Sequence, residues 1–204
     1  MLKLAVFVSG RGSNLKSIVD AIETRKLNAV VLTVVSNKSD APALSFAKDK
    51  SILTFVVSSN NNHEAISFFD LSQKLSELEI DLIVLAGFLK KIPDDFVELF
   101  ENRIINIHPA LLPSFGGKGM YGINVHKAVL ESSAKVSGAT VHFVNQNYDE
   151  GKIIAQKCVD ISDVKTPEEI AERVLKIEHQ LLPEVIQLFA EGKVKIINQR
   201  VVIE

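Results

Sequence analysis

The sequence has little cysteine, little excess charge and no long apolar run, and each scarcity excludes a class of protein. Cys158 is the single cysteine, so the chain has no internal disulfide and a reducing compartment is expected. Because Cys158 lies in an alternating apolar segment, we expect its thiol to be inert and packed in the core. The net charge of -2 and the pI near 6.2 leave no basic field for a phosphodiester backbone, which favours small-molecule substrates over nucleic acid.

The apolar runs are too short to cross a bilayer, and Met1 leads straight into a strand-like run without a charged leader. We therefore expect a cytoplasmic protein with no membrane partner. The histidines lack a metal-ligand spacing such as HExxH, so no metal is expected. With 47% hydrophobic residues and no internal repeat or linker, residues 1–204 fit a single domain. A monomer and a homodimer are both compatible with the sequence.

Short apolar runs alternate with segments of helical periodicity along the first half of the chain. The runs predict buried strands at 4–8, 29–35, 52–57 and 80–85. The remaining segments predict helices at 15–22, 41–50 and about 63–78, a polar loop at 58–62, and a short helix opened by Pro93. This alternation predicts an α/β fold with right-handed crossovers, a Rossmann-like open twisted, mainly parallel sheet with helices on both faces.

The second half of the chain predicts a strand that ends at His108, a helix at about 124–132, strands at 139–144 and 152–159, and a terminal strand or hairpin at 194–203. A long helix begins at Thr166, where Pro167 and Glu169 complete a capping box. Pro183 is expected to kink or divide this helix. Glu178 falls on the helix's apolar stripe. Burying a carboxylate costs free energy unless a partner binds it.

The glycine-rich turn after the first strand suits an anion. Glycines let the backbone approach closely, and the amides of Gly12, Ser13 and Asn14 open a helix whose dipole favours a phosphate. Leu15 stands where a dinucleotide fingerprint has its third glycine, so phosphate is favoured over NAD. A turn that merely connects strand to helix is the alternative.

Two polar side chains share one face at the end of the strand before Pro109. The side-chain period of two places Asn106 and His108 together, and Pro109 stops the strand so that the imidazole lies at its carboxyl end. The pattern favours His108 as a general acid or base and Asn106 as a donor to a developing oxyanion. A core histidine that donates to a backbone carbonyl is the alternative. Asp149 is a candidate third member, although by itself it reads as a turn aspartate.

Several motifs, taken together and in order, carry a resemblance to one enzyme family. They are SGRGSNL (9–15), LAGF (85–88), NIHPALLP (106–113), VHFV (141–144) with Asp149 and Gly151, IAQ (154–156), and Glu178 with His179. In this combination the chain resembles the phosphoribosylglycinamide formyltransferases, folate-dependent enzymes of purine biosynthesis, over almost its full length. Its length also matches their free-standing bacterial form.

The resemblance implies transfer of the formyl group of 10-formyltetrahydrofolate, as a cosubstrate, to the amine of glycinamide ribonucleotide. The catalytic residues that it implies are Asn106, His108 and Asp149. The ribonucleotide would be held by Gly12, Ser13, Asn14 and Glu178. The residues that it implies for the folate pocket are Leu89, Lys90, Lys91, Ile92, Val97 and Val144.

Three features depart from the family's pattern. His63 stands where many members have an arginine that helps to hold the phosphate, and Lys90 stands where an arginine often meets the folate. The glycine-rich segment 116–122 is longer than in the best-known members, and we expect it to be a mobile loop. We hypothesise that Lys118 in this loop supplies the phosphate contact that His63 does not.

Other formyl-folate enzymes share the central Asn-x-His and the aspartate. A methionyl-tRNA formyltransferase would need a further carboxyl-terminal domain and a basic surface. A formyltetrahydrofolate hydrolase usually has an additional amino-terminal domain, and a sugar-amine formyltransferase would not need the phosphate turn. A non-catalytic nucleotide-binding module is the alternative from another class, and the intact trio of Asn106, His108 and Asp149 argues against it.

Overall fold

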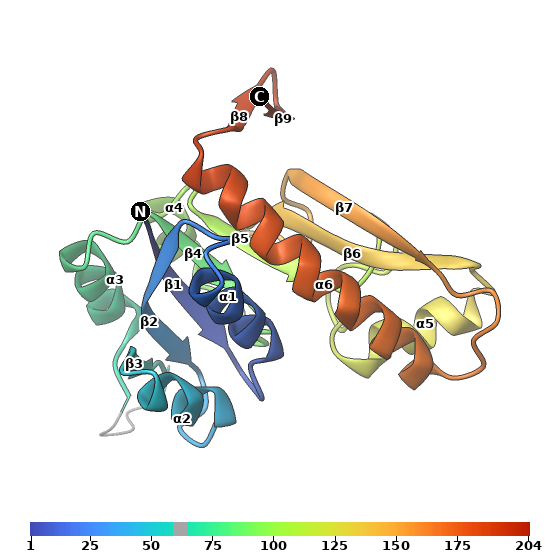
Figure 1. The fold of residues 1–204 in the computed structure, drawn as a ribbon, viewed down its shortest axis with the longest axis horizontal. Helices are drawn as coiled ribbons and strands as arrows, with labels where there is room; N and C mark the ends of the chain where they lie inside the picture. The colour runs from blue at the N-terminus through green and yellow to red at the C-terminus, as the bar shows by residue number, and fades with distance from the viewer. Residues whose placement is uncertain (59–64) are drawn as a thin grey trace. The chain divides into compact units, whose positions relative to one another are not determined.

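The computed structural model describes residues 1–58 and 65–204, which form two compact units, Met1–Ile105 and Asn106–Glu204. Among these residues the main sheet has seven strands in the order β3-β2-β1-β4-β5-β6-β7 (Figure 1). The predicted α/β fold with a mainly parallel sheet is confirmed. The predicted residues of the 58–62 loop beyond Ser58, and His63, lie outside the described residues.

The first unit is built around β1 (Leu2–Val8), which pairs in parallel with β2 (Ala29–Ser36) and with β4 (Leu82–Leu85). On its far side β2 pairs in parallel with β3 (Leu53–Val56). The continuous apolar run of β1 is explained by burial, because each side chain from Leu4 to Val8 is fully covered. The strand order reverses between β1 and β4, and open α/β sheets bind ligands at the carboxyl ends of the strands on either side of such a switch.

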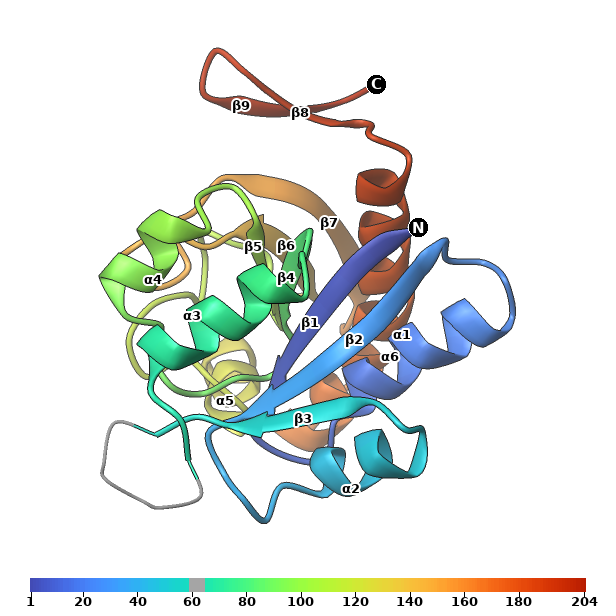
Figure 2. The ribbon, with the colours of Figure 1, turned by 90° about the vertical axis from the view of Figure 1, so that its left-hand side faces the viewer.

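Four helices of this unit flank its strands. They are α1 (Ser13–Glu23), α2 (Pro42–Asp49), α3 (Phe68–Glu77) and α4 (Asp94–Leu99). Figure 2 shows α1 and α2 on one side of β1, β2 and β3, with α3 and α4 on the other. Helices therefore lie on both faces of this part of the sheet, as predicted.

The start of α3 differs from the prediction of about residue 63. Ile66 forms a parallel bridge with Val57, so the chain is still extended there. Ser67 then caps the helix, because its side chain accepts a hydrogen bond from the Asp70 amide. A local cap and a sheet contact thus fix the helix start at Phe68, beyond the point that apolar spacing suggested.

The second unit contains the end of β5 (Ile104–His108), followed by α5 (Ile123–Glu131), β6 (Val136–Phe143) and β7 (Ile153–Asp160). β7 pairs antiparallel with β6, which makes the sheet mixed. α6 (Pro167–Ala190) packs against α5, β6 and β7, and its predicted capping box is present. The chain ends in a hairpin of β8 (Val194–Ile197) and β9 (Arg200–Ile203).

The prediction for Cys158 was wrong, and of the two outcomes expected at Pro183 the structure excludes division of the helix. Cys158 is exposed rather than packed in the core, because β7 is the outermost strand and alternate side chains point away from the sheet. Pro183 does not divide α6, which continues to Ala190. The buried stripe on both sides of the proline, including Leu182 and Val185, holds the helix together where local propensity would break it.

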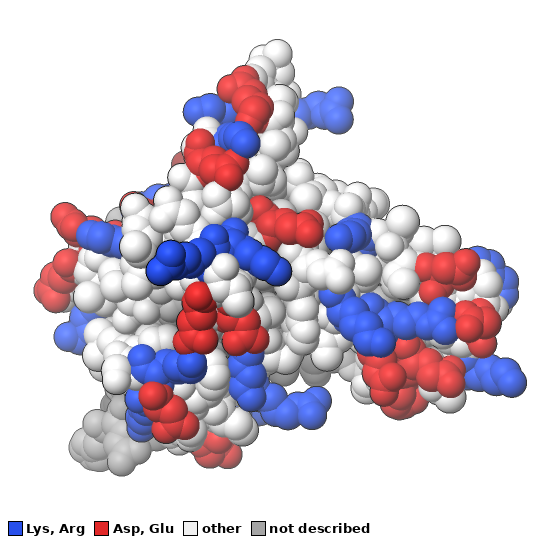
Figure 3. All heavy atoms as spheres, viewed as in Figure 1, with Lys and Arg blue, Asp and Glu red and all other residues white. Residues whose placement is uncertain are grey.

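On the face that Figure 3 shows, Lys and Arg side chains are interspersed with Asp and Glu side chains. This mixture agrees with the small net charge of -2. Within residues 1–58 and 65–204, no helix combines the length and the apolar character needed to cross a membrane.

Candidate active site

The strand β5 ends at His108, and Pro109 follows it, as the sequence predicted. Ile105 and Ile107 are buried on one face of the strand, while Asn106 is half-buried on the other. His108 shares the face of Asn106 and is itself buried. The strand therefore presents an amide and an imidazole side by side at its carboxyl end.

Asp149 lies next to His108, which brings together the three predicted catalytic residues. Its Oδ2 atom is 3.5 Å from Nδ1 of His108 and accepts a hydrogen bond of 2.9 Å from the Gly117 amide. Asp149 adopts a left-handed backbone with φ of 58°, a conformation that aspartate tolerates better than most residues. The long loop that follows β6 thereby returns the carboxylate to the end of β5.

The other nitrogen of the His108 ring fixes its tautomer. Nε2 lies 2.8 Å from the carbonyl oxygen of Phe115, and because a carbonyl only accepts, Nε2 carries the hydrogen. In the neutral ring Nδ1 is then a bare lone pair that faces the Asp149 carboxylate. A proton taken up at Nδ1 is placed directly against that carboxylate.

Burial and charge act in opposite directions on this pair. Burial lowers the pKa of His108 below its ordinary value, although Asp149 and the Phe115 carbonyl work to raise it. Burial works to raise the pKa of Asp149, but its polar neighbours, among them the Gly117 amide that donates to Oδ2, hold the pKa below its usual range. At neutral pH the resting site therefore combines an ionised carboxylate with a largely neutral imidazole.

His142 is a member of the site that the sequence reasoning did not single out. It is buried on β6, the neighbour of β5, and its Nε2 atom lies 3.1 Å from Nδ2 of Asn106. The same atom is 3.6 Å from Oδ1 of Asp149. The signal was its place in the VHFV motif, where a histidine interrupts an apolar strand.

The segment that follows His108 is held by Thr140 on β6. The Thr140 hydroxyl donates to the carbonyl of Ala110 at 2.6 Å and accepts from the Leu112 amide at 3.1 Å. Gln156 on β7 donates to Thr140 and to the carbonyl of Leu112. The buried Thr140 hydroxyl thus both donates and accepts, and these bonds fix the backbone that directly follows His108.

Close to the site, α5 buries His126, whose Nδ1 atom has no hydrogen-bond partner in the described part of the chain. Burial, together with the nearby His108 ring, lowers the pKa of His126 to about 4. The ring is therefore neutral in the folded protein at pH 7.

This histidine predicts a loss of stability in acid. Between pH 6.5 and about 4 the unfolded chain binds a proton at His126 that the folded chain refuses, so stability falls as pH falls through this window. The full effect is up to about 3 kcal/mol. Urea unfolding of the wild type and of His126→Phe at pH 7 and pH 4.5 measures it, and we expect a smaller acid loss in the variant. Equal losses in the two proteins would contradict this assignment.

The predicted phosphate turn lies in the first unit at the end of β1. Gly12 is the residue before α1 and has φ of 73°, and a Cβ atom there would lie 2.6 Å from Cβ of Ala43. Only glycine fits both the left-handed backbone and the close approach of α2. Ser13 and Asn14 are the first two residues of α1, where backbone amides have no acceptor within the helix and the helix dipole favours an anion.

The segment after β4 holds most of the residues predicted for the folate pocket. Ser9 joins it to β1, because its backbone amide donates to Gly87 and its hydroxyl accepts from the Leu89 amide at 2.8 Å. Leu89 is exposed, and Lys91 forms an ion pair of 2.8 Å with Asp94. Ile92 and Val97 are buried, and the ammonium of Lys90 lies over the Phe68 ring. Val144, the last residue of the set, is half-buried in the second unit.

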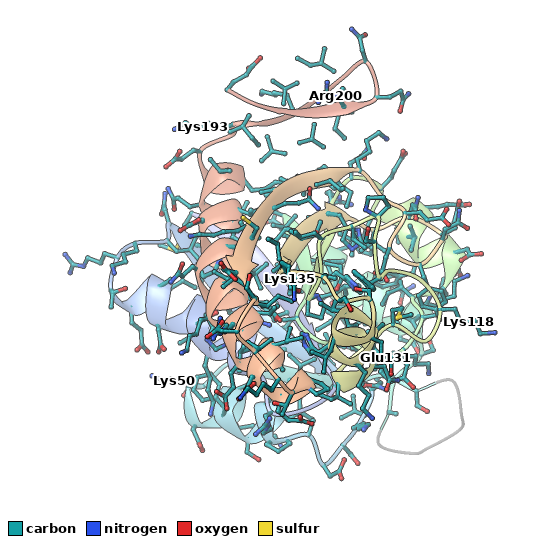
Figure 4. All side chains as sticks on the ribbon, turned by 90° about the vertical axis from the view of Figure 1, so that its right-hand side faces the viewer. Lys50, Lys118, Glu131, Lys135, Lys193 and Arg200 are labelled. Atoms are coloured by element: carbon teal, nitrogen blue, oxygen red, sulfur yellow. The ribbon has the colours of Figure 1, made fainter. Side chains whose placement is uncertain are left out.

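The remaining predicted residues belong to the second unit. Glu178 is buried on α6, as its place on the apolar stripe predicted. Lys118 is exposed and points outward from its loop (Figure 4). It stands between Gly117 and Gly119, which both have positive φ.

Comparison with known families agrees with this fold. The sequence model of the formyl transferase family matches residues 2–186. The chain therefore belongs to the formyl transferase family.

Relatives place the chain more closely. It is 47% identical to the chloroplastic phosphoribosylglycinamide formyltransferase of Arabidopsis thaliana, over 95% of this chain and 67% of that protein. It is 37% identical to the phosphoribosylglycinamide formyltransferase of Haemophilus influenzae, over 96% of this chain and 91% of that protein. The crystal structure of glycinamide ribonucleotide transformylase 1 from Symbiobacterium toebii matches with a TM-score of 0.89 at 35% identity, covering 100% of this chain and 94% of that one. Within its family, the chain belongs to the phosphoribosylglycinamide formyltransferases, enzymes of de novo purine biosynthesis.

Proposed function

We propose that the chain transfers the formyl group of 10-formyltetrahydrofolate to the amine of glycinamide ribonucleotide, with residues 1–204 acting as one catalytic domain. The observation that carries the proposal is the meeting of Asn106, His108 and Asp149 at the carboxyl end of β5. These groups supply what acyl transfer between two amines requires, namely donors for an oxyanion and a route for one proton.

Addition is the first step of this reaction. The amine attacks the formyl carbon, a carbon–nitrogen bond forms, and the carbonyl electron pair moves to the formyl oxygen. An N–H of Asn106 and the Nε2–H of the His108 ring donate to that oxygen as its negative charge develops. His108 meets this demand when Nε2–H exchanges the Phe115 carbonyl for the oxyanion, a better acceptor.

Elimination then requires one proton to move. The attacking amine must lose a proton, and the folate nitrogen must gain one as its bond to the formyl carbon breaks. The bare Nδ1 of His108 and the Asp149 carboxylate, 3.5 Å apart, form a pair that holds a proton between these steps. No covalent intermediate with the protein is needed.

The substrates are assigned to separate groups of residues. The N-terminus of α1, with Gly12, Ser13 and Asn14, takes the ribonucleotide phosphate, which the helix dipole favours. Glu178 takes the ribose or glycinamide part, which gives a reason for a buried carboxylate on an apolar stripe. The walls of the folate pocket are assigned to the residues after β4 and to Val144.

Lys118 gives a prediction on substrate binding. We expect Lys118→Ala to raise the KM for the ribonucleotide about tenfold with little change in kcat, because a lysine–phosphate contact acts on ground state and transition state alike. Steady-state kinetics with varied ribonucleotide measure the change. Lys135→Ala, another exposed lysine of the same unit, is the control. An unchanged KM in Lys118→Ala would reject the phosphate role.

One assay tests the proposed function. Purified protein is mixed with formyl-folate, and folate deformylation is followed with and without glycinamide ribonucleotide. We expect turnover only with the ribonucleotide. Turnover without it would indicate a hydrolase, turnover only with an amino sugar would indicate a sugar-amine enzyme, and none with any acceptor would indicate a binding module.

A further inference from the structure

We infer that His142 is a positioning residue that sets the side-chain amide of Asn106 for formyl transfer. The inference rests on the proposed function, since it concerns a residue that acts through Asn106. It adds a fourth side chain to the site. One ring nitrogen of His142 fixes the tautomer, and the other accepts a hydrogen bond from Asn106.

The first ring nitrogen fixes the tautomer. Nδ1 of His142 lies 2.8 Å from the backbone carbonyl oxygen of Phe143. Because that oxygen accepts only, Nδ1 carries the hydrogen, and Nε2 of the neutral ring is left as a lone pair. The Phe143 carbonyl on the strand therefore fixes the tautomer in which Nε2 of His142 is a hydrogen-bond acceptor.

The second ring nitrogen orients the amide of Asn106. At 3.1 Å from Nδ2, the lone pair on Nε2 accepts one of the two amide hydrogens. A flipped amide would turn its oxygen lone pairs toward the lone pair of Nε2 and lose this bond. His142 thus keeps the nitrogen of Asn106 on the site side, where its second hydrogen is available to the formyl oxygen.

The ring itself has little freedom to move. His142 is 2% exposed, and a Cβ atom added to Gly151 would lie 3.5 Å from its Nδ1. The pairing of β6 with β7 shifts register between Val141 and His142, an irregularity of the kind that re-aims side chains beside active sites. The strand backbone, the surrounding packing and the Phe143 carbonyl together hold the ring in place.

The distance to Asp149 agrees with this tautomer. Nε2 is 3.6 Å from Oδ1 of Asp149, which is longer than a hydrogen bond. A hydrogen on Nε2 would face an amide hydrogen of Asn106 and leave that amide without its acceptor. With a lone pair on Nε2, His142 makes no hydrogen bond to Asp149, whose carboxylate then pairs with His108. The second N–H of Asn106 is available to the substrate.

Two variants separate positioning from packing. His142→Phe keeps a buried ring and removes the acceptor, and we expect kcat to fall about 10- to 100-fold with the KM for each substrate within about threefold, a loss of the size seen when an orienting partner is removed. His142→Gln returns an acceptor near the position of Nε2, and we expect it to recover most of the lost kcat. A Gln variant as slow as the Phe variant would overturn the role.

A double-variant cycle shows whether His142 acts through Asn106. In an Asn106→Ala background, His142→Phe should cause little further loss of kcat, because the group that it positions is already absent. Losses that multiply would contradict the inference and indicate an independent role. Thermal unfolding of each variant establishes that the comparison is made between folded proteins.

A measurement without turnover keeps this inference distinct from the proposed function. Nitrogen NMR of wild-type protein at neutral pH should find Nδ1 of His142 protonated and Nε2 not protonated. A protonated Nε2 would overturn the inference even in an active enzyme. An inactive wild type with the expected tautomer would instead count against the proposed reaction alone.

Discussion

His108→Ala is expected to lower kcat for formyl transfer about 100- to 1000-fold while the protein still folds. The substitution removes an oxyanion donor and, with Nδ1, half of the pair that holds the transferred proton. The ring lies at the end of β5 and not in the middle of the core, so its loss leaves the buried residues Ile105 and Ile107 in place. Steady-state kinetics and a thermal unfolding curve are the two measurements.

Asp149→Asn tests the same pair from the other side. It keeps the size of the side chain and removes the charge, so we expect a folded protein with a loss of similar order to that of His108→Ala. Asn147→Ala is the matched control from the same loop, because its side chain bonds to Glu150 and not to the site. Near-normal turnover in either His108→Ala or Asp149→Asn would reject the assignment of the trio.

Gly151→Ala is expected to destabilise the protein by more than about 3 kcal/mol. A Cβ atom at Gly151 would lie 1.7 Å from the carbonyl oxygen of Phe143 and 2.7 Å from its carbonyl carbon. Both atoms belong to the backbone of β6, so no side-chain rotation relieves the clash. Because Asp149 is two residues away and His142 donates to the same carbonyl, the variant should also lose activity.

Urea denaturation measures this effect, with Gly10→Ala as the control. A Cβ atom at Gly10 meets nothing within 4 Å, and its φ is not in the left-handed region, so its stability should stay close to that of the wild type. If Gly151→Ala unfolded at the wild-type urea concentration, the close approach of the loop to β6 would be wrong.

Local patterns were sufficient to predict most of the fold. The fully buried run from Leu4 to Val8 read as a strand covered on both faces, and the Thr166 capping box marked the start of α6 to the residue. The errors came where tertiary contacts override local preference. Apolar spacing did not reveal that Ile66 pairs with Val57, nor that β7 is an outer strand with Cys158 exposed.

The candidate site was predictable only in part, for a related reason. Asn106 and His108 share a strand, so their period of two placed them together without any knowledge of the fold. Asp149 is forty-one positions further on, and periodicity gave no reason to bring it back; the family resemblance did. The carbonyl of Phe115 and the ring of His142 escaped both approaches, because their roles depend on hydrogen-bond directions that appear only in three dimensions.

The chemistry at the end of β5 is tested most directly by following the formyl carbon itself. The protein is incubated with formyl-folate labelled at that carbon, with and without glycinamide ribonucleotide, and the label is located by mass spectrometry. We predict that the label enters the ribonucleotide as a formamide, and that His108→Ala slows its appearance about 100- to 1000-fold. Label released as free formate at a rate independent of the ribonucleotide would contradict the proposed function, and transfer undiminished in His108→Ala would contradict the catalytic role of His108.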